Sequence, residues 1–309
     1  MAMRPPHAAQ QHSTAWPLEQ KMQLEGLMGL LRLAETNPES SVRQIEMTEI
    51  MDRGTKADVW YARKVPNFRF LSDEELPKGA IYGMKYKTVV LTPQKFLTWL
   101  YERLQARGIK FRRTRVSSLA DLKGRGHDIL INASGIGAEN LKDVMEKNLT
   151  SWRLQCVDRL FIRRGDRGYY STALSGLDGT VYVGGVLTEN DRDLSISKEQ
   201  RKKICQNAHN NQPDVFPSPD PKDWPILYDH VDVYATMDRR VCGVRCEKEV
   251  VDGQRVIHAY GHNAGGYVHS FGLAREIVTL AEDYLYELPV TGKLQLRRWS
   301  SKTGGVGLQ

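Results

Sequence analysis

Apolar residues recur at helical spacing in several segments of the chain. Between Pro17 and Glu35 they form a broad stripe, which predicts a helix that is covered on most sides. From Thr92 to Gly108 they fall on one face, with threonine as the cap and glycine at the stop. Ser197–Gln200 is a capping box that begins another helix, and Ser270–Glu287 again has helical spacing. These segments predict four helices.

Shorter apolar segments between turn signals predict strands. Asp128–Asn132 ends in an uninterrupted apolar run, which is typical of a strand that is buried on both faces. Strands and helices alternate in the first half of the chain, whereas strands follow one another in the second half. This order predicts an α/β fold with a mixed or antiparallel sheet. The other predicted strands are Val42–Ile50, Asp58–Ala62, Ile109–Val116, Arg153–Arg163, Val181–Val186, His230–Thr236, Val241–Lys248 and Gln254–Tyr260.

Length and charge exclude several classes of protein. A chain of 309 residues is long enough for about two domains, and its formal net charge is +7. Its basic residues form short groups without interleaved aromatic residues, so we expect solvated faces and no nucleic-acid partner; a basic funnel for an anionic ligand is the alternative. No apolar run has the length of a membrane span, and the first residues have no apolar core of a secretory signal. The four cysteines lack metal-site spacing, which favours reduced cysteines in an intracellular protein without a metal.

Two glycine-containing segments follow predicted strands, where α/β proteins bind ligands. Ile131–Ala138 ends a strand in a small-residue turn, in which Gly135 and Gly137 let a ligand or another backbone approach closely. Tyr260–Tyr267 is a glycine-rich loop that enters a helix, and a helix N-terminus stabilises developing negative charge. Each segment is equally compatible with an ordinary structural turn.

A pair of tyrosines, Tyr169 and Tyr170, precedes the strand Val181–Val186. Their hydroxyls could line a pocket, or the two residues could be half-buried in a strand. From composition and spacing alone, the chain is an α/β protein with a candidate ligand cleft.

Several stretches, taken in order, carry a resemblance to a known family. They are Lys85–Pro93 with the helix and strand up to Phe111, Ile131–Ala138, Gly184-Gly185, Cys242–Glu247, and Val256-Ile-His-Ala-Tyr-Gly-His262. Together they resemble the D-amino-acid oxidase / D-aspartate oxidase family over most of the chain. No single stretch is specific to this family, but the set of stretches in this order is.

The resemblance implies a fold of two parts and a redox activity. An incomplete FAD-binding Rossmann-like domain would comprise residues 1–45, 107–150 and 250–288. A mixed or antiparallel substrate-binding sheet would comprise residues 46–106 and 151–249, and a flexible tail would follow from 289 to 309. The family transfers a hydride from a D-amino acid to FAD; the imine then hydrolyses to a keto acid, and oxygen yields hydrogen peroxide.

The resemblance also assigns roles to particular residues. The substrate would meet Tyr169 or Tyr170. The position of the family's carboxylate-binding arginine falls on Met237 or Asp238, so the arginine fork would have to come from the neighbouring Arg239 or Arg240 through a shift of one or two residues. The expected FAD contacts are Val116, Ser134, Gly135, His262, Asn263, Ala264, Gly265, Gly266, Tyr267 and Val268.

The sequence departs from the family pattern at both ends of the expected site. It contains no G-x-G-x-x-G, the motif with which the family binds the adenosine diphosphate half of FAD. Ala173 occupies the position of a second family tyrosine, and the loop after His262 reads Asn-Ala-Gly-Gly. The alternative to an oxidase is therefore a family member without flavin chemistry, acting as a binding protein or a redox-independent tailoring enzyme.

Partner and location complete the expectations. The substrate would be a small amine or D-amino acid, with no membrane partner. The strand ending at Asn132 would leave an open sheet edge, so we expect a homodimer or another chain that covers it. The last residues do not form the S-K-L peroxisomal signal, which leaves cytoplasm and peroxisome as alternatives.

Overall fold

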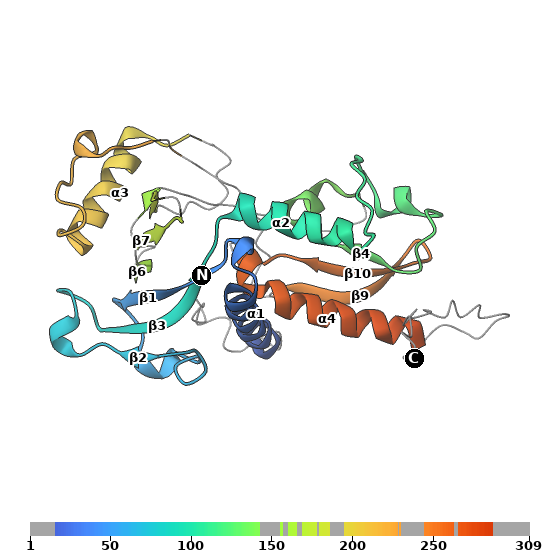
Figure 1. Cartoon of the computed structure of the whole chain (residues 1–309), viewed down its shortest axis with the longest axis horizontal. Coiled ribbons are helices and arrows are strands. Elements are labelled where there is room, and N and C mark those ends of the chain that lie inside the picture. Colours follow the sequence, from blue (N-terminus) through green and yellow to red (C-terminus); the bar gives the residue numbers. More distant parts are fainter. Residues whose placement is uncertain are drawn as a thin grey trace, which may run out of the picture.

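The protein has two β-sheets at opposite ends; one long helix lies between them and packs against a second long helix, which runs along the smaller sheet (Figure 1). The computed structural model describes residues 16–142, 155–156, 160–165, 169–177, 179–185, 195–227, 229, 244–262 and 265–286. A seven-stranded sheet lies at the left of the view, and a three-stranded sheet lies at the right. This mixed α/β architecture confirms the predicted fold class.

All four predicted helices are present. They are α1 (Trp16–Thr36), α2 (Pro93–Ala106), α3 (Lys198–Asn211) and α4 (Gly266–Tyr286). The capping box of Ser197 and Gln200 precedes α3 as expected, and Gly108 has the left-handed φ of +84° that follows α2. Helix α4 begins four residues before the predicted Ser270, so part of the glycine-rich loop is its first turn. Short 3₁₀ helices are η1 (Pro38–Ser40), η2 (Lys56–Asp58), η3 (Asp73–Glu75), η4 (Leu119–Leu122), η5 (Gly135–Asn140) and η6 (Pro221–Asp223).

The seven-stranded sheet has the order β2-β3-β1-β6-β7-β8-β5. Only β1 and β6 are parallel within it; the other neighbours are antiparallel. The strands are β1 (Arg43–Met51), β2 (Arg69–Phe70), β3 (Tyr82–Val90), β5 (Gln155–Cys156), β6 (Leu160–Arg164), β7 (Tyr170–Ser175) and β8 (Val181–Gly184).

Both faces of this sheet are covered by helices. On the face that we call inner, Met47 and Met51 of β1 pack in one core with Leu27 and Leu30 of α1. On the opposite, outer face, Ile50 belongs to a second core. That core also contains Phe161, Ala173, and Ile204 and Ala208 of α3. Alternation along each strand thus sends its side chains into two separate cores.

The three-stranded sheet has the order β4-β10-β9, with β4 (Leu130–Asn132), β9 (Arg245–Val251) and β10 (Gln254–Tyr260). Strand β4 is parallel to β10, and β9 is antiparallel to it. The prediction that the strand before Ala133 is buried on both faces is wrong, because Ile131 is 48% exposed. Within the described residues β4 has only one neighbour, so it is an edge strand.

Two further predicted strands are wrong. Asp58–Ala62 is not a strand but the end of η2 followed by turns, although its apolar members Val59 and Tyr61 are buried as the alternation indicated. Ile109–Val116 has no hydrogen-bonded strand partner among the described residues. The alternation of apolar residues in Asp58–Ala62 therefore predicted correctly which side chains are buried. A segment forms a strand, however, only where the backbone of a neighbouring strand is available for hydrogen bonds.

Helices α1 and α4 connect the two ends of the molecule through a close contact. A Cβ on Gly272 would lie 2.3 Å from the Met22 carbonyl oxygen, and one on Gly26 would lie 2.0 Å from that of Val268. Only glycine allows the two backbones to approach so closely. Ion pairs flank the contact, one between Lys21 and Glu276 and one of 3.6 Å between Arg275 and Glu25. None of the helices in the described ranges is long and apolar enough to span a bilayer.

Candidate active site at the ends of β4 and β10

The carboxyl ends of β4 and β10 lie side by side. The strands are parallel and in register, with His258 opposite Asn132. Each strand then leaves the sheet in a turn, β4 into Ala133–Gly137 and β10 into the loop that begins at Gly261. Helix α4 starts at the end of the second turn. Ligands of open α/β sheets bind beyond the carboxyl ends of strands, so these turns are the first candidate site.

Buried polar side chains fix the first turn. The Asn132 side-chain oxygen accepts hydrogen bonds from the Ser134 hydroxyl at 2.7 Å and from the Ser134 backbone N–H at 3.3 Å. The Asn132 amide nitrogen lies 3.2 Å from Nδ1 of His258. Burial and the nearby Arg245 lower the pKa of His258, so its neutral ring accepts at Nδ1. The turn is thereby held to the central strand of the sheet.

Two glycines leave open space at this end of the sheet. Gly135 has a φ of +58°, and no atom of the described residues lies within 4 Å of the position that its Cβ would take. Likewise, no atom of the described residues lies within 4 Å of the position that a Cβ on Gly266, the first residue of α4, would take. The first N–H groups of a helix have no partner within the helix and favour an electron-rich group. The geometry therefore provides room for a ligand next to unpaired backbone donors.

His262 lies in the second turn, after the end of β10. Its Nε2 is buried and has no hydrogen-bond partner among the described residues. Burial lowers the pKa of His262 to about 4, so the ring is neutral at physiological pH. Its carbonyl accepts from the Gly265 N–H at 3.0 Å, and the His269 ring is 5.7 Å away. A buried polar nitrogen without a partner is costly, unless a ligand supplies that partner.

The residues that follow have structural partners. Tyr267 packs edge-on against Phe96 at a centroid distance of 6.0 Å and reaches the inner core of the seven-stranded sheet. Val268 is buried, and its backbone carbonyl faces Gly26 of α1. Val116 packs against the small core beside β10. These three residues therefore position the site through packing.

The inner face of the seven-stranded sheet carries a buried charged cluster. Glu49 of β1 accepts a hydrogen bond from the Tyr61 hydroxyl at 2.6 Å and lies 3.3 Å from Nη2 of Arg164. The Arg164 guanidinium also lies over the Tyr170 ring, 5.4 Å from its centroid. Nε of Arg164 is buried without a hydrogen-bond partner in the described residues. Arg164 thus retains donors that a bound anion could use.

Sequence reasoning missed Glu49 and Arg164, although a signal for the arginine was present. Arg164 follows Leu160 and Ile162 at spacing two, so the alternation of β6 places it on the face of two buried apolar residues. A charged residue on a buried face needs a partner. Which carboxylate supplies it depends on the parallel pairing of β1 with β6, which the sequence does not show.

The predicted catalytic tyrosines lie on opposite faces of β7. Tyr170 contacts Arg164 on the inner face. The Tyr169 hydroxyl instead accepts a hydrogen bond of 3.0 Å from Asn211, at the end of α3 on the outer side. The two hydroxyls therefore cannot line one pocket. Arg239, Arg240, Asn263 and Ala264 lie outside the described residues.

Other chemistries find little support in the described part of the chain. No group of three or more His, Cys, Asp or Glu side chains is placed there to hold a metal ion. Cys205 and Cys246 are free thiols, and burial raises the pKa of each to about 11. Such thiols are poor nucleophiles at neutral pH.

Comparison with known proteins identifies the family. The family model described as FAD dependent oxidoreductase matches residues 5–280. The chain belongs to this family. It is 26% identical over 262 residues to a D-aspartate oxidase of Talaromyces thermophilus, covering 81% of this chain and 69% of the relative. It is 25% identical to a D-amino-acid oxidase of Schizosaccharomyces pombe, covering 81% and 74%.

Solved structures share the fold of this FAD-dependent oxidoreductase. Glycine oxidase from Geobacillus kaustophilus superposes with a TM-score of 0.60 at 15% identity, covering 89% of this chain and 82% of that one. L-proline dehydrogenase from P. horikoshii has a TM-score of 0.64 at 12% identity, with 91% and 82% covered. The resemblance found in the ordered motifs is thereby confirmed.

The residues of this oxidoreductase fit the flavin end of FAD. The unpaired Nε2 of His262, the open space at Gly135 and Gly266 and the N-terminus of α4 all occur at one end of the sheet. An isoalloxazine ring offers hydrogen-bond acceptors and gains negative charge on reduction, which a helix N-terminus stabilises. The glycine-rich motif for the adenosine diphosphate end does not occur in the 309 residues.

Proposed function

We propose that the chain oxidises the amine of a small amino acid, in the first instance a D-amino acid, to an imine. The imine hydrolyses in water to a keto acid and ammonia. The FAD family supports the reaction class, and relatives named D-aspartate oxidase and D-amino-acid oxidase support the substrate class. The structural observation that carries the proposal is the buried, unpaired Nε2 of His262 beside the open space at Gly266.

FAD, when bound, accepts a hydride from the substrate and passes the electrons to oxygen, giving hydrogen peroxide. The chain's own part is to bind and orient. We assign the flavin contacts to Ser134, Gly135 and the loop from His262 to Gly266, including Asn263 and Ala264. Backbone N–H groups at the start of α4 would donate to the ring, and neutral His262 would pair its Nε2 with it. Residues 1–45, 107–150 and 250–288 would form the FAD-binding part; 46–106 and 151–249 would form the substrate part.

An arginine is the expected partner of the substrate carboxylate, because its planar fork matches the two oxygens. We keep Arg239 and Arg240 in this role from the family resemblance. Of the two tyrosines, we favour Tyr170, because it lies on the inner face beside the spare donors of Arg164. Tyr169 is engaged with Asn211 on the other side.

Substitution at Gly266 tests the cofactor site. In Gly266→Val the new side chain enters open space, so the protein without flavin should fold as the wild type does. Because that space would hold the ring, we expect FAD affinity to fall at least tenfold, measured by quenching of flavin fluorescence. Thr279→Val, on an exposed turn of the same helix, is the matched control and should bind FAD as the wild type does. If both variants bound FAD with the same affinity, the assignment of the flavin to this end of the sheet would be wrong.

Substitution of the arginine pair tests the reaction. With FAD supplied, peroxide release from D-amino acids should lose about a hundredfold or more in kcat/KM in Arg239→Ala/Arg240→Ala, since charge-assisted hydrogen bonds contribute about 1.5–3 kcal/mol each. Arg112→Ala/Arg113→Ala removes a second, exposed arginine pair and should keep full activity. L-enantiomers serve as the substrate control.

A protein that takes up no FAD and releases no peroxide would favour the family member without flavin chemistry. Coverage of the β4 edge by a second copy or another chain stays a prediction, and the oligomeric state in solution tests it. Residence in the cytoplasm or peroxisome likewise stays a prediction.

A further inference from the structure

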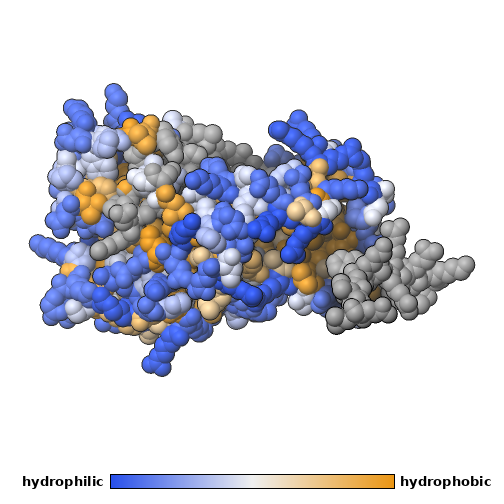
Figure 2. Space-filling view, viewed as in Figure 1, coloured by the Kyte–Doolittle hydropathy of each residue, from blue (hydrophilic) through white to orange (hydrophobic). Residues whose placement is uncertain are grey.

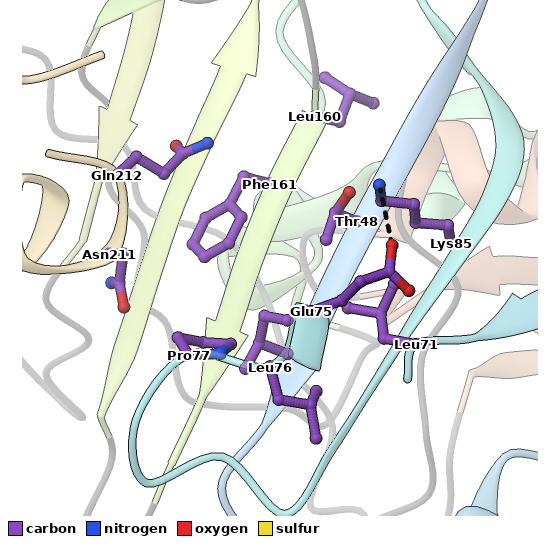
Figure 3. A pocket seen from close by; sticks show the side chains of 11 residues that line it. Thr48, Leu71, Glu75, Leu76, Pro77, Lys85, Leu160, Phe161, Asn211 and Gln212 are labelled. Atoms are coloured by element: carbon purple, nitrogen blue, oxygen red, sulfur yellow. Dashed lines mark ion pairs between the residues drawn. The ribbon is translucent and has the colours of Figure 1, made fainter. Parts of the chain in front are cut away.

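A cavity of about 400 Å³ opens on the outer face of the seven-stranded sheet (Figure 3). Its lining comes from β1, β3, β6, the segment between β2 and β3, and the end of α3. None of its lining residues belongs to the three-stranded sheet or α4, so it is distinct from the proposed flavin site. Its volume falls in the range of small-molecule sites, roughly 300–1,000 Å³.

One row of side chains across the sheet forms the floor of the cavity. Lys85 of β3 is opposite Thr48 of β1, and Thr48 is opposite Phe161 of β6. Side chains that are opposite one another on neighbouring strands share a face and stand about 5 Å apart. Figure 3 shows the row, with a cation at one end, a hydroxyl in the middle and an aromatic ring at the other end.

An apolar wall closes one side of the cavity because Gly83 has no side chain. A Cβ on Gly83 would lie 2.7 Å from Cδ1 of Leu71 and 3.1 Å from Cδ2 of Leu76. The two leucines can therefore pack down onto β3, next to Ile50 of β1. The wall is a packed part of the outer core, which makes the cavity a preformed site.

The two charged residues of the lining, Glu75 and Lys85, differ in how many hydrogen bonds they make within the protein. Glu75 receives a bidentate pair of hydrogen bonds from Arg69, at 2.6 and 2.7 Å, and a third from the Ser72 N–H at 3.1 Å. These partners, Arg69 first, lower the pKa of Glu75 to about 2. Lys85 reaches Glu75 only at 3.8 Å, beyond hydrogen-bond distance, and its side chain is 26% exposed. The Glu75 carboxylate is therefore already hydrogen-bonded within the protein, whereas the Lys85 ammonium can still donate hydrogen bonds to a ligand.

Neutral polar groups of the lining have spare hydrogen-bonding capacity as well. Within the described residues, neither the Thr48 hydroxyl nor the Gln212 side-chain amide has a hydrogen-bond partner. Both can donate to an anionic oxygen. The open donors lie at the Lys85–Thr48 end and beside α3, whereas Phe161, Leu71 and Leu76 supply apolar surface.

We propose that this cavity binds a small apolar carboxylate. The carboxylate accepts hydrogen bonds from the Lys85 ammonium and the Thr48 hydroxyl, and the hydrocarbon body packs on Phe161 and the two leucines. A charge-assisted bond to a partly buried ammonium is stronger than one between neutral groups, so the negative charge provides selectivity. A cation or an ammonium group is disfavoured, because the Lys85 ammonium repels it and three hydrogen bonds already engage the one carboxylate of the lining.

Binding of 4-methylpentanoate to the full chain tests this proposal, with 4-methylpentanamide as the uncharged probe of the same shape. Binding is followed through the Ile50 δ-methyl signal by NMR, because this residue lines the cavity and is absent from the strand-end turns. We expect a Kd on the order of 1 mM for the acid, as befits so small a ligand. The amide should bind at least tenfold more weakly.

Two variants test whether the Lys85 ammonium is the group that binds the carboxylate of the acid. Lys85→Met leaves the Arg69–Glu75 pair intact and should weaken binding of the acid at least tenfold, to the level of the amide. Lys87→Met, two residues along the same strand and outside the lining, should bind as the wild type does. The proposal is overturned if the acid and the amide bind alike, if Lys85→Met keeps wild-type affinity, or if Ile50 does not respond at about twenty times the expected Kd.

Discussion

The two sheets of the molecule are stabilised in different ways. In the seven-stranded sheet, strands β1 and β6 are paired on both sides, and each face packs against a helix-lined core. In the three-stranded sheet only β10 is a central strand, and both flanking strands are edges within the described residues. Ile131 of β4 and Val250 of β9 are 48% and 65% exposed, and Figure 2 shows apolar surface over this end of the molecule.

This difference separates the main stabilising cores from the turns that we assign to the flavin. The two cores that pack on the large sheet contain most of the buried apolar residues, whereas the small sheet supports the turns that we assign to the cofactor. Rigid scaffolds with ligand loops at their ends are the usual arrangement in α/β proteins. We therefore expect substitutions in the large sheet to affect unfolding first and those at the end of the small sheet to affect ligand binding and its pH dependence.

The largest expected effect concerns the buried acid of the large sheet. Glu49→Ala removes a 1% exposed carboxylate and leaves the Arg164 guanidinium without its counter-ion. Breaking such a pair should lower the free energy of unfolding by about 3–5 kcal/mol, measured by urea denaturation.

Glu247→Ala provides the matched change in the small sheet. Its carboxylate is 57% exposed and lies 2.6 Å from Arg245. Exposed ion pairs contribute about 1 kcal/mol or less, so the loss should be correspondingly small. Equal losses in the two variants would contradict the difference between the sheets.

A pair of isoleucines isolates the contribution of packing. Ile162 of β6 is 2% exposed in the inner core, and Ile162→Ala should cost about 2–5 kcal/mol because it leaves a cavity. Ile131→Ala on the β4 edge should change the free energy of unfolding by about 0.5 kcal/mol or less. A cost of several kcal/mol at Ile131 would show instead that this edge is covered in solution.

An effect confined to a narrow pH window is expected from His262. Burial lowers the pKa of His262 to about 4, against about 6.5 for a histidine in an unfolded chain. The unfolded state therefore takes up a proton first, and the free energy of unfolding falls as pH decreases from about 6.5 to about 4, by at most about 3 kcal/mol. Above that window the contribution is complete.

His262→Asn should flatten this part of the curve, measured by urea denaturation between neutral pH and pH about 4. Thr279→Val, an exposed substitution that removes no titratable group, is the control and should keep the wild-type slope. A wild-type slope in His262→Asn would assign the pH dependence to other groups.

The sequence predicted best those helices whose ends carry capping residues, proline or glycine. Thr92, Pro93 and Gly108 bound α2 within two residues, and the Ser197 capping box placed α3. The segment Asp58–Ala62 was misassigned, yet Val59 and Tyr61 are buried as its alternation indicated. Periodicity reports which side chains avoid water; the backbone form depends on which partners are near.

The site could be predicted only in part, for the same reason. The glycine-rich turns after β4 and β10 are contiguous in sequence and were visible as motifs. The Glu49–Arg164 pair joins residues 115 positions apart, and Tyr169 and Tyr170 could be separated only once β7 was placed between two cores.

The sequence by itself thus determined the family, the helices and the location of the two turns, because caps, glycines and ordered motifs act over a few residues. Tertiary structure alone decided that Lys85, Thr48 and Phe161 share one row and that, within the described residues, β4 is an edge strand and Nε2 of His262 has no hydrogen-bond partner. These properties depend on strand order and register, which long-range pairing fixes through the burial of apolar side chains on both faces of a sheet.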